Sequence, residues 1–198
     1  MTTHLLDRHR HTGRPALPVL GDMALPLARL HEACGPARHT LAMLVAAATR
    51  GPVFWITPGW LGDRLNPDGM TGFADPGRFT FLAPTRPEDL LWTLEEVLRS
   101  GAVPLAVADL PDAPSMTPVR RLHLAAETGA QTGPHVPLGL ILTPGDGGAA
   151  GVETRWHMAP AHQAASRGWT LSRLRARTAP QAAWHLAGAP GRWRMTRM

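Results

Sequence analysis

The stretch HEACGPARHTLAML, residues 31–44, has the residue types and the setting of a phosphate-binding loop. A turn at Gly35 separates an apolar run from a run with helical periodicity, and such turns bind phosphate through backbone N–H groups and a helix N-terminus. The consensus loop also has a second glycine, a lysine for the outer phosphates and, seven residues after the first glycine, a Ser or Thr for magnesium. Here Thr40 follows Gly35 by only five residues, and Arg38 and His39 stand where glycine and lysine would be. The sequence therefore predicts a degenerate nucleotide loop that holds no cofactor.

The second feature that could take part in chemistry is an acid at the end of an apolar strand. Residues 104–110 read PLAVADL and place Asp109 where nucleotide-binding α/β proteins hold a metal ion. With no lysine or second glycine in the loop, we expect Asp109 to cap the following turn and expect no metal site. Glu95 and Glu96 are expected on the solvated face of a helix, and His123 at a helix surface or satisfied in the core. We therefore select none of these four residues as catalytic.

Composition excludes several classes of chemistry. All 20 residues counted as Lys or Arg are arginine, so the chain has no lysine for a Schiff base, a general base or a phosphate loop. Its one cysteine, Cys34, cannot form an internal disulfide. The chain has 198 residues, enough for one well-buried domain, and no apolar run approaches the roughly 18 residues that span a bilayer. We expect a cytoplasmic protein without membrane contacts.

The positive charge is concentrated near the C-terminus. From Gly151 onward eight arginines face one acidic residue, Glu153, whereas residues 1–150 hold 12 arginines and 14 acids. The alternation in residues 168–178 would place Arg173, Arg175 and Arg177 on one side of a strand, about 6–7 Å apart. With them we select as candidate partner or DNA contacts Arg155, Arg192 and Arg194. The alternative is that the nearby tryptophans pack over the sheet while the arginines only solvate the surface.

Short apolar runs that alternate with amphipathic stretches predict βα units and a largely parallel sheet. Strands are expected at residues 27–34, 52–57, 79–83, 104–110 and 137–143, and a long loop with one short helix at residues 58–78. After residue 151 the pattern changes to alternation, which predicts antiparallel strands within residues 152–160, 168–178 and 191–197.

Helices are expected at three places. One covers residues 38–50, with Leu41, Leu44, Val45 and Ala48 on its buried face. The second is predicted to begin with Thr85 as N-cap, with Glu88 completing a capping box, and to end near Gly101. The third starts at Ser115 or Thr117 and is predicted to end at Gly129.

We expect three regions. Residues 1–24 form a flexible segment with one docking patch at 17–20, and its histidines, at positions 4, 9 and 11, are too poorly preorganised for a metal site. Residues 25–178 form the folded domain, and residues 179–198 form a basic C-terminal extension.

The order of these motifs resembles a known family. Glycine turn, helix, two strands, amphipathic helix, RSGAV and a strand ending in Asp109 together look like the core of RecA-type recombinases. The chain is more similar to ImuA-like proteins of the RecA superfamily, and the similar stretches are LPLARLHEACGP, RGPVFWITP, RPEDLLWTLEEVLRSGAV, RRLHLAAETG, TRWHMAPAH and GWTLSRLRART. This resemblance implies a RecA-like three-layer α/β domain across residues 25–178, often without an intact phosphate loop.

The resemblance also implies a role. ImuA-like proteins act in SOS-type mutagenic repair, in translesion synthesis, with the inactive polymerase homologue ImuB, an error-prone DNA polymerase and, in some cases, RecA. We therefore expect a noncatalytic accessory protein that works through protein contacts. Two alternatives stay open: a divergent ATPase that uses Arg38 and Asp109, and a protein that binds single-stranded DNA directly.

Overall fold

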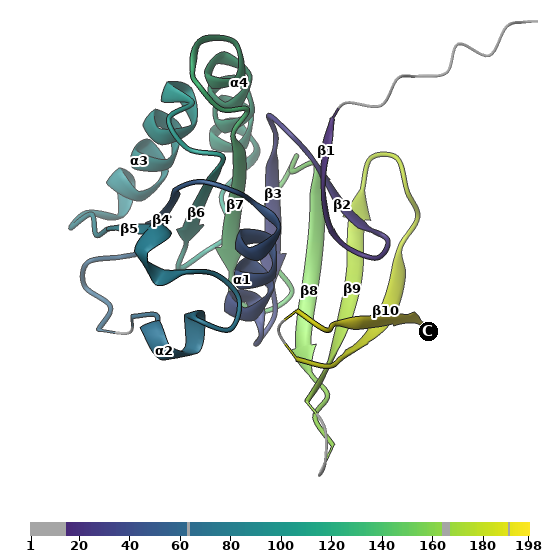
Figure 1. Cartoon of the computed structure of the whole chain (residues 1–198). Coiled ribbons are helices and arrows are strands. Elements are labelled where there is room, and N and C mark those ends of the chain that lie inside the picture. Colours follow the sequence, from purple (N-terminus) through teal and green to yellow (C-terminus); the bar gives the residue numbers. More distant parts are fainter. Residues whose placement is uncertain (1–14, 63, 164–166, 190) are drawn as a thin grey trace, which may run out of the picture.

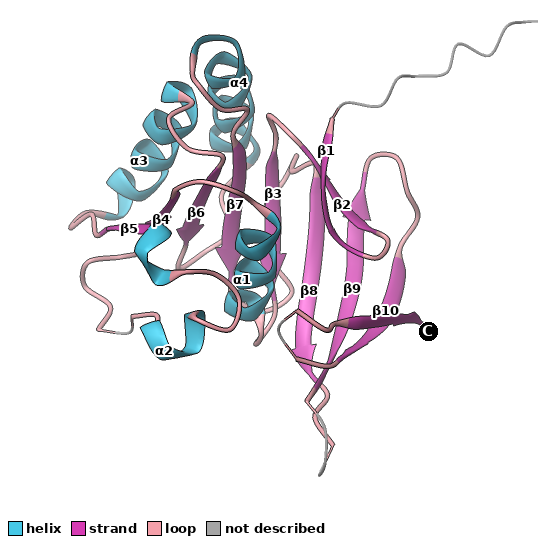
Figure 2. Ribbon diagram, viewed as in Figure 1, coloured by secondary structure: helices cyan, strands magenta, loops and turns pink. Residues whose placement is uncertain are grey.

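The computed structural model describes residues 15–62, 64–163, 167–189 and 191–198 (Figures 1 and 2). The first half contains β1 (Ala16–Leu20), β2 (Met23–Pro26), β3 (Leu30–Cys34), α1 (Arg38–Ala48), β4 (Val53–Ile56), α2 (Pro67–Met70), a 3-10 turn η1 (Pro76–Arg78), β5 (Phe79–Leu82) and α3 (Pro87–Ser100). The second half contains β6 (Leu105–Asp109), α4 (Met116–Thr132), β7 (Leu138–Thr143), β8 (Thr154–Pro160), β9 (Gly168–Ala176), β10 (Ala182–Ala187) and β11 (Arg194–Arg197). Among these residues no helix is both long and apolar enough to cross a membrane.

A nine-stranded mixed sheet runs through the molecule in the order β11-β10-β9-β8-β3-β7-β6-β4-β5. Every neighbouring pair from β8 to β5 is parallel, and the pairs β8–β9, β9–β10 and β10–β11 are antiparallel. The prediction of an α/β fold with a mostly parallel sheet and antiparallel C-terminal strands is confirmed.

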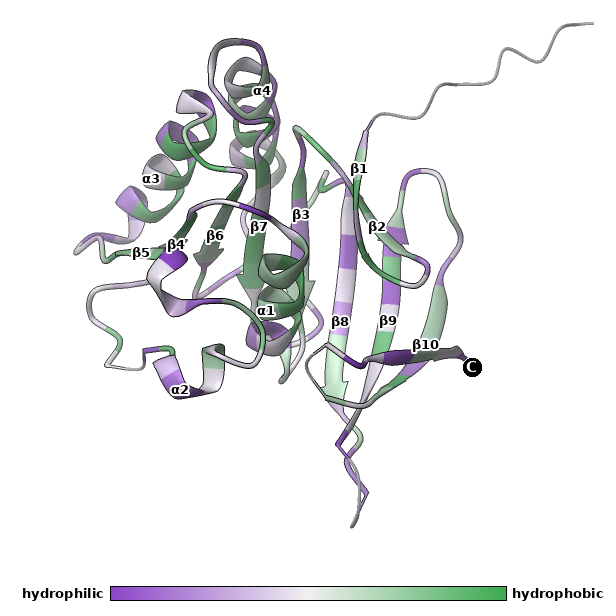
Figure 3. Ribbon diagram, in the orientation of Figure 1, coloured by the Kyte–Doolittle hydropathy of each residue, from purple (hydrophilic) through white to green (hydrophobic). Residues whose placement is uncertain are grey.

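Alternating side chains of the parallel strands pack on opposite faces of the sheet. On β6, Leu105 and Val107 join the cluster that contains the buried face of α1, whereas Ala106 and Ala108 join the cluster that contains α3 and α4. Strands β4, β6 and β7 are mostly apolar (Figure 3), as expected for strands covered on both faces, whereas β3 carries the buried polar residues His31 and Glu32. The sheet thus lies between α1 on one face and the α3–α4 pair on the other.

The N-terminal region differs from the expected flexible lead-in. β1 and β2 form an antiparallel hairpin, and Met23 and Leu25 are buried in the α1-side cluster. The hairpin covers the antiparallel strands on this side (Figure 1), and its Asp22 accepts from the indole N–H of Trp184 in β10. The three histidines at positions 4, 9 and 11 lie outside the described residues.

Two predicted helix boundaries are wrong. The N-cap of α3 is Arg86, not Thr85, and no side chain caps this end, although Gly101 ends the helix in the left-handed conformation as predicted. α4 begins after Ser115 but continues through Gly129 to Thr132. A Cβ on Gly129 would lie 2.0 Å from the Leu98 carbonyl oxygen, so this glycine permits close packing of α4 on α3 instead of ending the helix.

The C-terminal extension is part of the sheet. β10, which the sequence reading missed, pairs with β9 and with β11, and its Trp184 and Leu186 are buried. β10 and β11 therefore complete the antiparallel half of the sheet, and Trp184 and Leu186 lie in the same apolar cluster as Met23 and Leu25 of the N-terminal hairpin.

Candidate functional site

The glycine turn between β3 and α1 is closed by the protein itself. The Gly35 N–H donates to the Gly145 carbonyl at 2.8 Å, and the Ala37 N–H donates to the Met158 carbonyl at 3.0 Å. A Cβ on Gly35 would lie 2.5 Å from that same Met158 oxygen. Two of the backbone donors that could bind a phosphate are thus already bonded to β8 and to the turn before it.

The side chains after this turn meet the strand-end acid. Nε2 of His39 lies 2.6 Å from Oδ2 of Asp109, and Nε of Arg38 lies 3.6 Å from Oδ1. Asp109 therefore binds the start of α1, whereas the sequence predicted that it would cap its own turn. The His39 ring also stacks on Trp55, with 6.3 Å between the ring centroids.

A cavity of about 820 Å³ opens beside this cluster. It lies where β4, β5 and β6 end, which is where open α/β sheets bind their ligands. Its lining residues are Arg38, His39, Trp55, Thr57, Leu61, Arg64, Leu65, Asn66, Pro67, Phe81, Ala83 and Asp109. Thr40 belongs to the first turn of α1 and is not among these residues. Sequence analysis selected Arg38, His39 and Asp109. It did not predict the apolar wall, which comes from β5 and from residues 58–78, a stretch predicted as a loop with one short helix.

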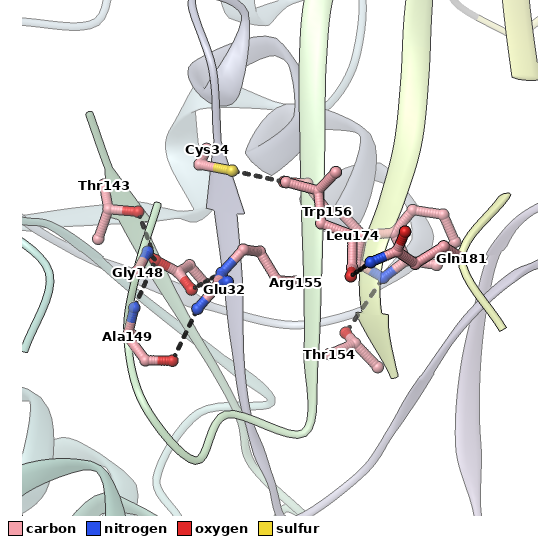
Figure 4. Close-up of polar contacts among 10 residues, drawn as sticks. All are labelled: Glu32, Cys34, Thr143, Gly148, Ala149, Thr154, Arg155, Trp156, Leu174 and Gln181. Carbon is pink, nitrogen blue, oxygen red and sulfur yellow. Dashed lines mark hydrogen bonds and ion pairs between the residues drawn. The ribbon is translucent and has the colours of Figure 1, made fainter. Parts of the chain in front are cut away.

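Arg155 belongs to a buried polar network, not to a surface strip (Figure 4). Its Nε donates to Oε2 of Glu32 at 2.5 Å, and the Glu32 side chain is fully buried. The other carboxylate oxygen accepts from Thr143 Oγ1 and from the N–H groups of Gly148 and Ala149. Glu32 therefore anchors the turn between β7 and β8, a role that the sequence reading missed.

Arg173 lies over two tryptophans. Its guanidinium carbon is 5.6 Å from the Trp156 ring and 5.2 Å from the Trp184 ring, and its Nε donates to the Pro180 carbonyl. Such a cation–π arrangement stabilises the sheet face, and the partly exposed Arg173 therefore has partners within the protein.

The remaining selected arginines do not form one strip. Arg177 pairs with Glu153 at 3.4 Å. Arg175 is exposed, and it lies opposite Arg155 near the end of β9. Arg194 of β11 lies opposite Ala187 of β10, which in turn lies opposite Gly168 at the start of β9. Arg175 and Arg194 are thus separated by seven residues along β9, about 24 Å at the usual rise of a strand. Arg192, like both of these, is exposed.

Three titratable side chains that are buried or half-buried serve the fold. The buried Glu95 accepts from Arg99 and from Arg121 of α4, so its expected place on a solvated face is wrong. Half-buried His123 accepts from the Leu30 N–H and bonds the Gly151 carbonyl, as a satisfied core histidine does. Burial, with the nearby Glu32 carboxylate, raises the pKa of the Cys34 thiol to about 12, so this cysteine is not a nucleophile at neutral pH.

His31 lies at the centre of a second buried network. The indole N–H of Trp156 donates to Thr154 Oγ1, which lies 2.8 Å from Nδ1 of His31. Nε2 of His31 bonds the Pro26 carbonyl at 2.9 Å and so ties β3 to the hairpin. Burial lowers the pKa of His31 to about 4, which keeps the imidazole neutral in the folded chain.

No protein-family model matches the chain, and a search of curated proteins found no match either.

Proposed function

We propose that this chain is an ImuA-like, RecA-like accessory protein of SOS-type mutagenic repair. It acts in translesion synthesis without catalysis of its own, through contacts with an ImuB-type polymerase homologue, RecA or an error-prone DNA polymerase. The order of sequence motifs described above supports the family, and the mixed sheet with helices on both faces is compatible with it.

One observation carries the noncatalytic role. The turn at Gly35 occupies the position of a phosphate loop, yet the N–H groups of Gly35 and Ala37 bond carbonyls of Gly145 and Met158. A triphosphate would have to displace both bonds and would find no lysine. The turn thus preserves the packing of β3 on α1 in place of nucleotide chemistry.

A surface for partner contacts lies at the β5 edge of the sheet. We define the β5-edge surface by four exposed side chains, Trp60, Leu61, Phe81 and Trp92. The loop that carries Trp60 and Leu61 is held to the end of β5 by the Thr57 and Gly59 N–H groups, which donate to the Leu82 and Pro84 carbonyls. Exposed tryptophan and phenylalanine beside a free strand edge are features of protein-binding surfaces.

A binding experiment with purified proteins tests this function. The full chain is immobilised, and the ImuB-type homologue, the error-prone polymerase and RecA of the same genome are passed over it separately. We expect one of them to bind, and Trp92→Ala to weaken that binding at least about tenfold, as hot-spot tryptophans do. Leu124→Ala is the matched control, because Leu124 is a similarly exposed apolar residue on α4.

The possible outcomes test the accessory function and the β5-edge surface separately. If none of the three proteins binds at micromolar concentrations, the accessory function is wrong. If one binds but Trp92→Ala and Leu124→Ala behave alike, the function stands and the β5-edge surface is not its contact.

A further inference from the structure

The cavity at the ends of β4, β5 and β6 has the dimensions of a small-ligand site. Its volume of about 820 Å³ falls within the range of roughly 300–1,000 Å³ that is usual for such sites. Apolar side chains form much of its wall, and a few polar groups converge on it, the combination that orients small ligands.

The charges of the cavity favour an anion. Both oxygens of Asp109, the one acid in the lining, face cations or donors of the protein, because Oδ2 bonds His39 and Oδ1 faces Arg38. The Asp109 side chain is only 15% exposed, whereas Arg38 is 25% exposed and His39 39% exposed. A second arginine, Arg64, lies at the wall. A ligand in the cavity therefore meets the two arginines more fully than it meets the carboxylate.

Arg38 has hydrogen-bonding capacity that the protein does not use. Its Nε is buried and has no hydrogen-bond partner among the described residues, since Asp109 lies 3.6 Å away. Buried donors are almost always bonded, so this guanidinium is under-satisfied. Nε itself is closed to the cavity, and the exposed part of the Arg38 side chain is where an acceptor group would bind. A carboxylate or phosphate is the acceptor that a guanidinium binds best.

The apolar wall indicates the other half of the ligand. Phe81 and Leu61 are about half exposed, and both line the cavity. His39, also in the lining, stacks on Trp55, and the His39–Asp109 bond fixes its ring. Exposed aromatic and aliphatic side chains around a rigid ring favour a flat apolar body next to the charged group.

We propose that the cavity binds a small organic anion, a carboxylate or phosphate ester carried on a flat apolar body, with Arg38 at the charge and Phe81 at the body. This site differs from a phosphate loop, because side chains bind the ligand while the backbone donors of the Gly35 turn stay bonded within the protein. The inference goes beyond the proposed function, which needs no small ligand.

Two probes of similar shape test the charge requirement. The full chain is titrated with naphthoate and with uncharged naphthalenemethanol, and binding is followed by saturation-transfer NMR and calorimetry. We expect saturable binding of naphthoate, at least about tenfold tighter than that of the alcohol, because charged hydrogen bonds are the strong ones.

Variants assign the two halves of the ligand. Arg38→Gln is expected to remove the preference for naphthoate, and Arg38→Lys to retain part of it. Phe81→Ala, at an exposed position, weakens both probes and does not depend on whether Arg38 variants fold. Arg120→Gln, an exposed arginine on α4 outside the cavity, leaves both affinities unchanged.

Several results would overturn the proposal. Binding of naphthoate that does not saturate at millimolar concentration, equal affinities for the two probes, or no effect of Arg38→Gln in a folded variant would each do so. Displacement of naphthoate by magnesium-ATP with the same dependence on Arg38 would reassign the cavity to nucleotides. Leu61 and Phe81 belong both to this cavity and to the β5-edge surface, but Trp92 does not line the cavity, so the Trp92→Ala experiment tests partner binding separately from these results.

Discussion

His39 and Asp109 are 70 residues apart in the sequence, and Nε2 of the histidine lies 2.6 Å from Oδ2 of the carboxylate. The bond joins the first turn of α1 to the end of β6 across the intervening strand β7. A carboxylate only accepts, so Nε2 carries the hydrogen and the pair fixes the imidazole against Trp55.

Removal of the charge of Asp109 should cost modest stability. In Asp109→Asn the amide keeps the shape, but only its oxygen can accept from His39, and the negative charge that Arg38 faces is lost. We expect the free energy of unfolding to fall by about 1 kcal/mol, the value of one hydrogen bond. Urea denaturation measures this change, and Asp112→Asn, at an exposed position nearby, should change it by less than about 0.5 kcal/mol. Equal effects of both substitutions would mean that the His39 bond contributes nothing.

Substitution of Glu32 should reduce the free energy of unfolding much more than substitution of Asp109. Glu32→Gln replaces one acceptor oxygen with a donor that faces Arg155 or the N–H groups of Gly148 and Ala149. Breaking a buried ion pair typically costs about 3–5 kcal/mol, because the remaining charge stays buried without compensation. Guanidinium denaturation should show a loss of this order. Arg175→Gln, next to Arg155 across the strands but exposed, is the control and should be near neutral; a large effect there would contradict the division between structural and free arginines.

Stability should fall in mild acid through His31. Its pKa is about 4 in the folded chain against 6.5 without burial, so between these pH values the unfolded chain binds a proton that the folded chain does not. The free energy of unfolding therefore falls as pH decreases from 6.5 to about 4, by about 3 kcal/mol from this residue alone.

Unfolding measured at several pH values checks this expectation. His31→Gln should give a shallower slope than the unsubstituted chain in this window, whatever its stability at pH 7. The pKa of His123 is also lowered, chiefly by burial, so a smaller slope of the same sign should remain in the variant. An imidazole resonance of His31 that titrates near pH 6.5 would contradict the prediction.

Gly129 and Gly69 give a matched pair of helical glycines. Alanine normally stabilises a helix relative to glycine, yet a Cβ at Gly129 would lie 2.0 Å from the Leu98 carbonyl oxygen. We expect Gly129→Ala to destabilise by about 3 kcal/mol, because α3 and α4 must move apart. At Gly69 nothing lies within 4 Å of the added carbon, so Gly69→Ala should be neutral or slightly stabilising. Thermal denaturation distinguishes the two, and a stable Gly129→Ala variant would show that the helices can separate cheaply.

The sequence by itself determined the local elements. The apolar spacing of Leu41, Leu44 and Val45 predicted α1, and the run before Asp109 predicted β6, because periodicity and turn residues act within one segment. It also determined that a phosphate loop at Gly35 lacks its lysine. The end of α4 was less predictable, since packing of α4 on α3 overrode the local signal at Gly129. The cap of α3 also differs by one residue from the prediction at Thr85, because no side chain caps this end of the helix.

The tertiary structure decided what each polar residue does. Glu32 and Arg155 are 123 residues apart and meet only because β8 lies beside β3. The same neighbourhood brings the Met158 carbonyl onto the Gly35 turn, and the pairing of β9 with β10 places Arg173 over two tryptophans. Strand order depends on long-range packing, which no local pattern encodes, so the sequence predicted which side chains carry charge and the fold decided which of those charges remain free.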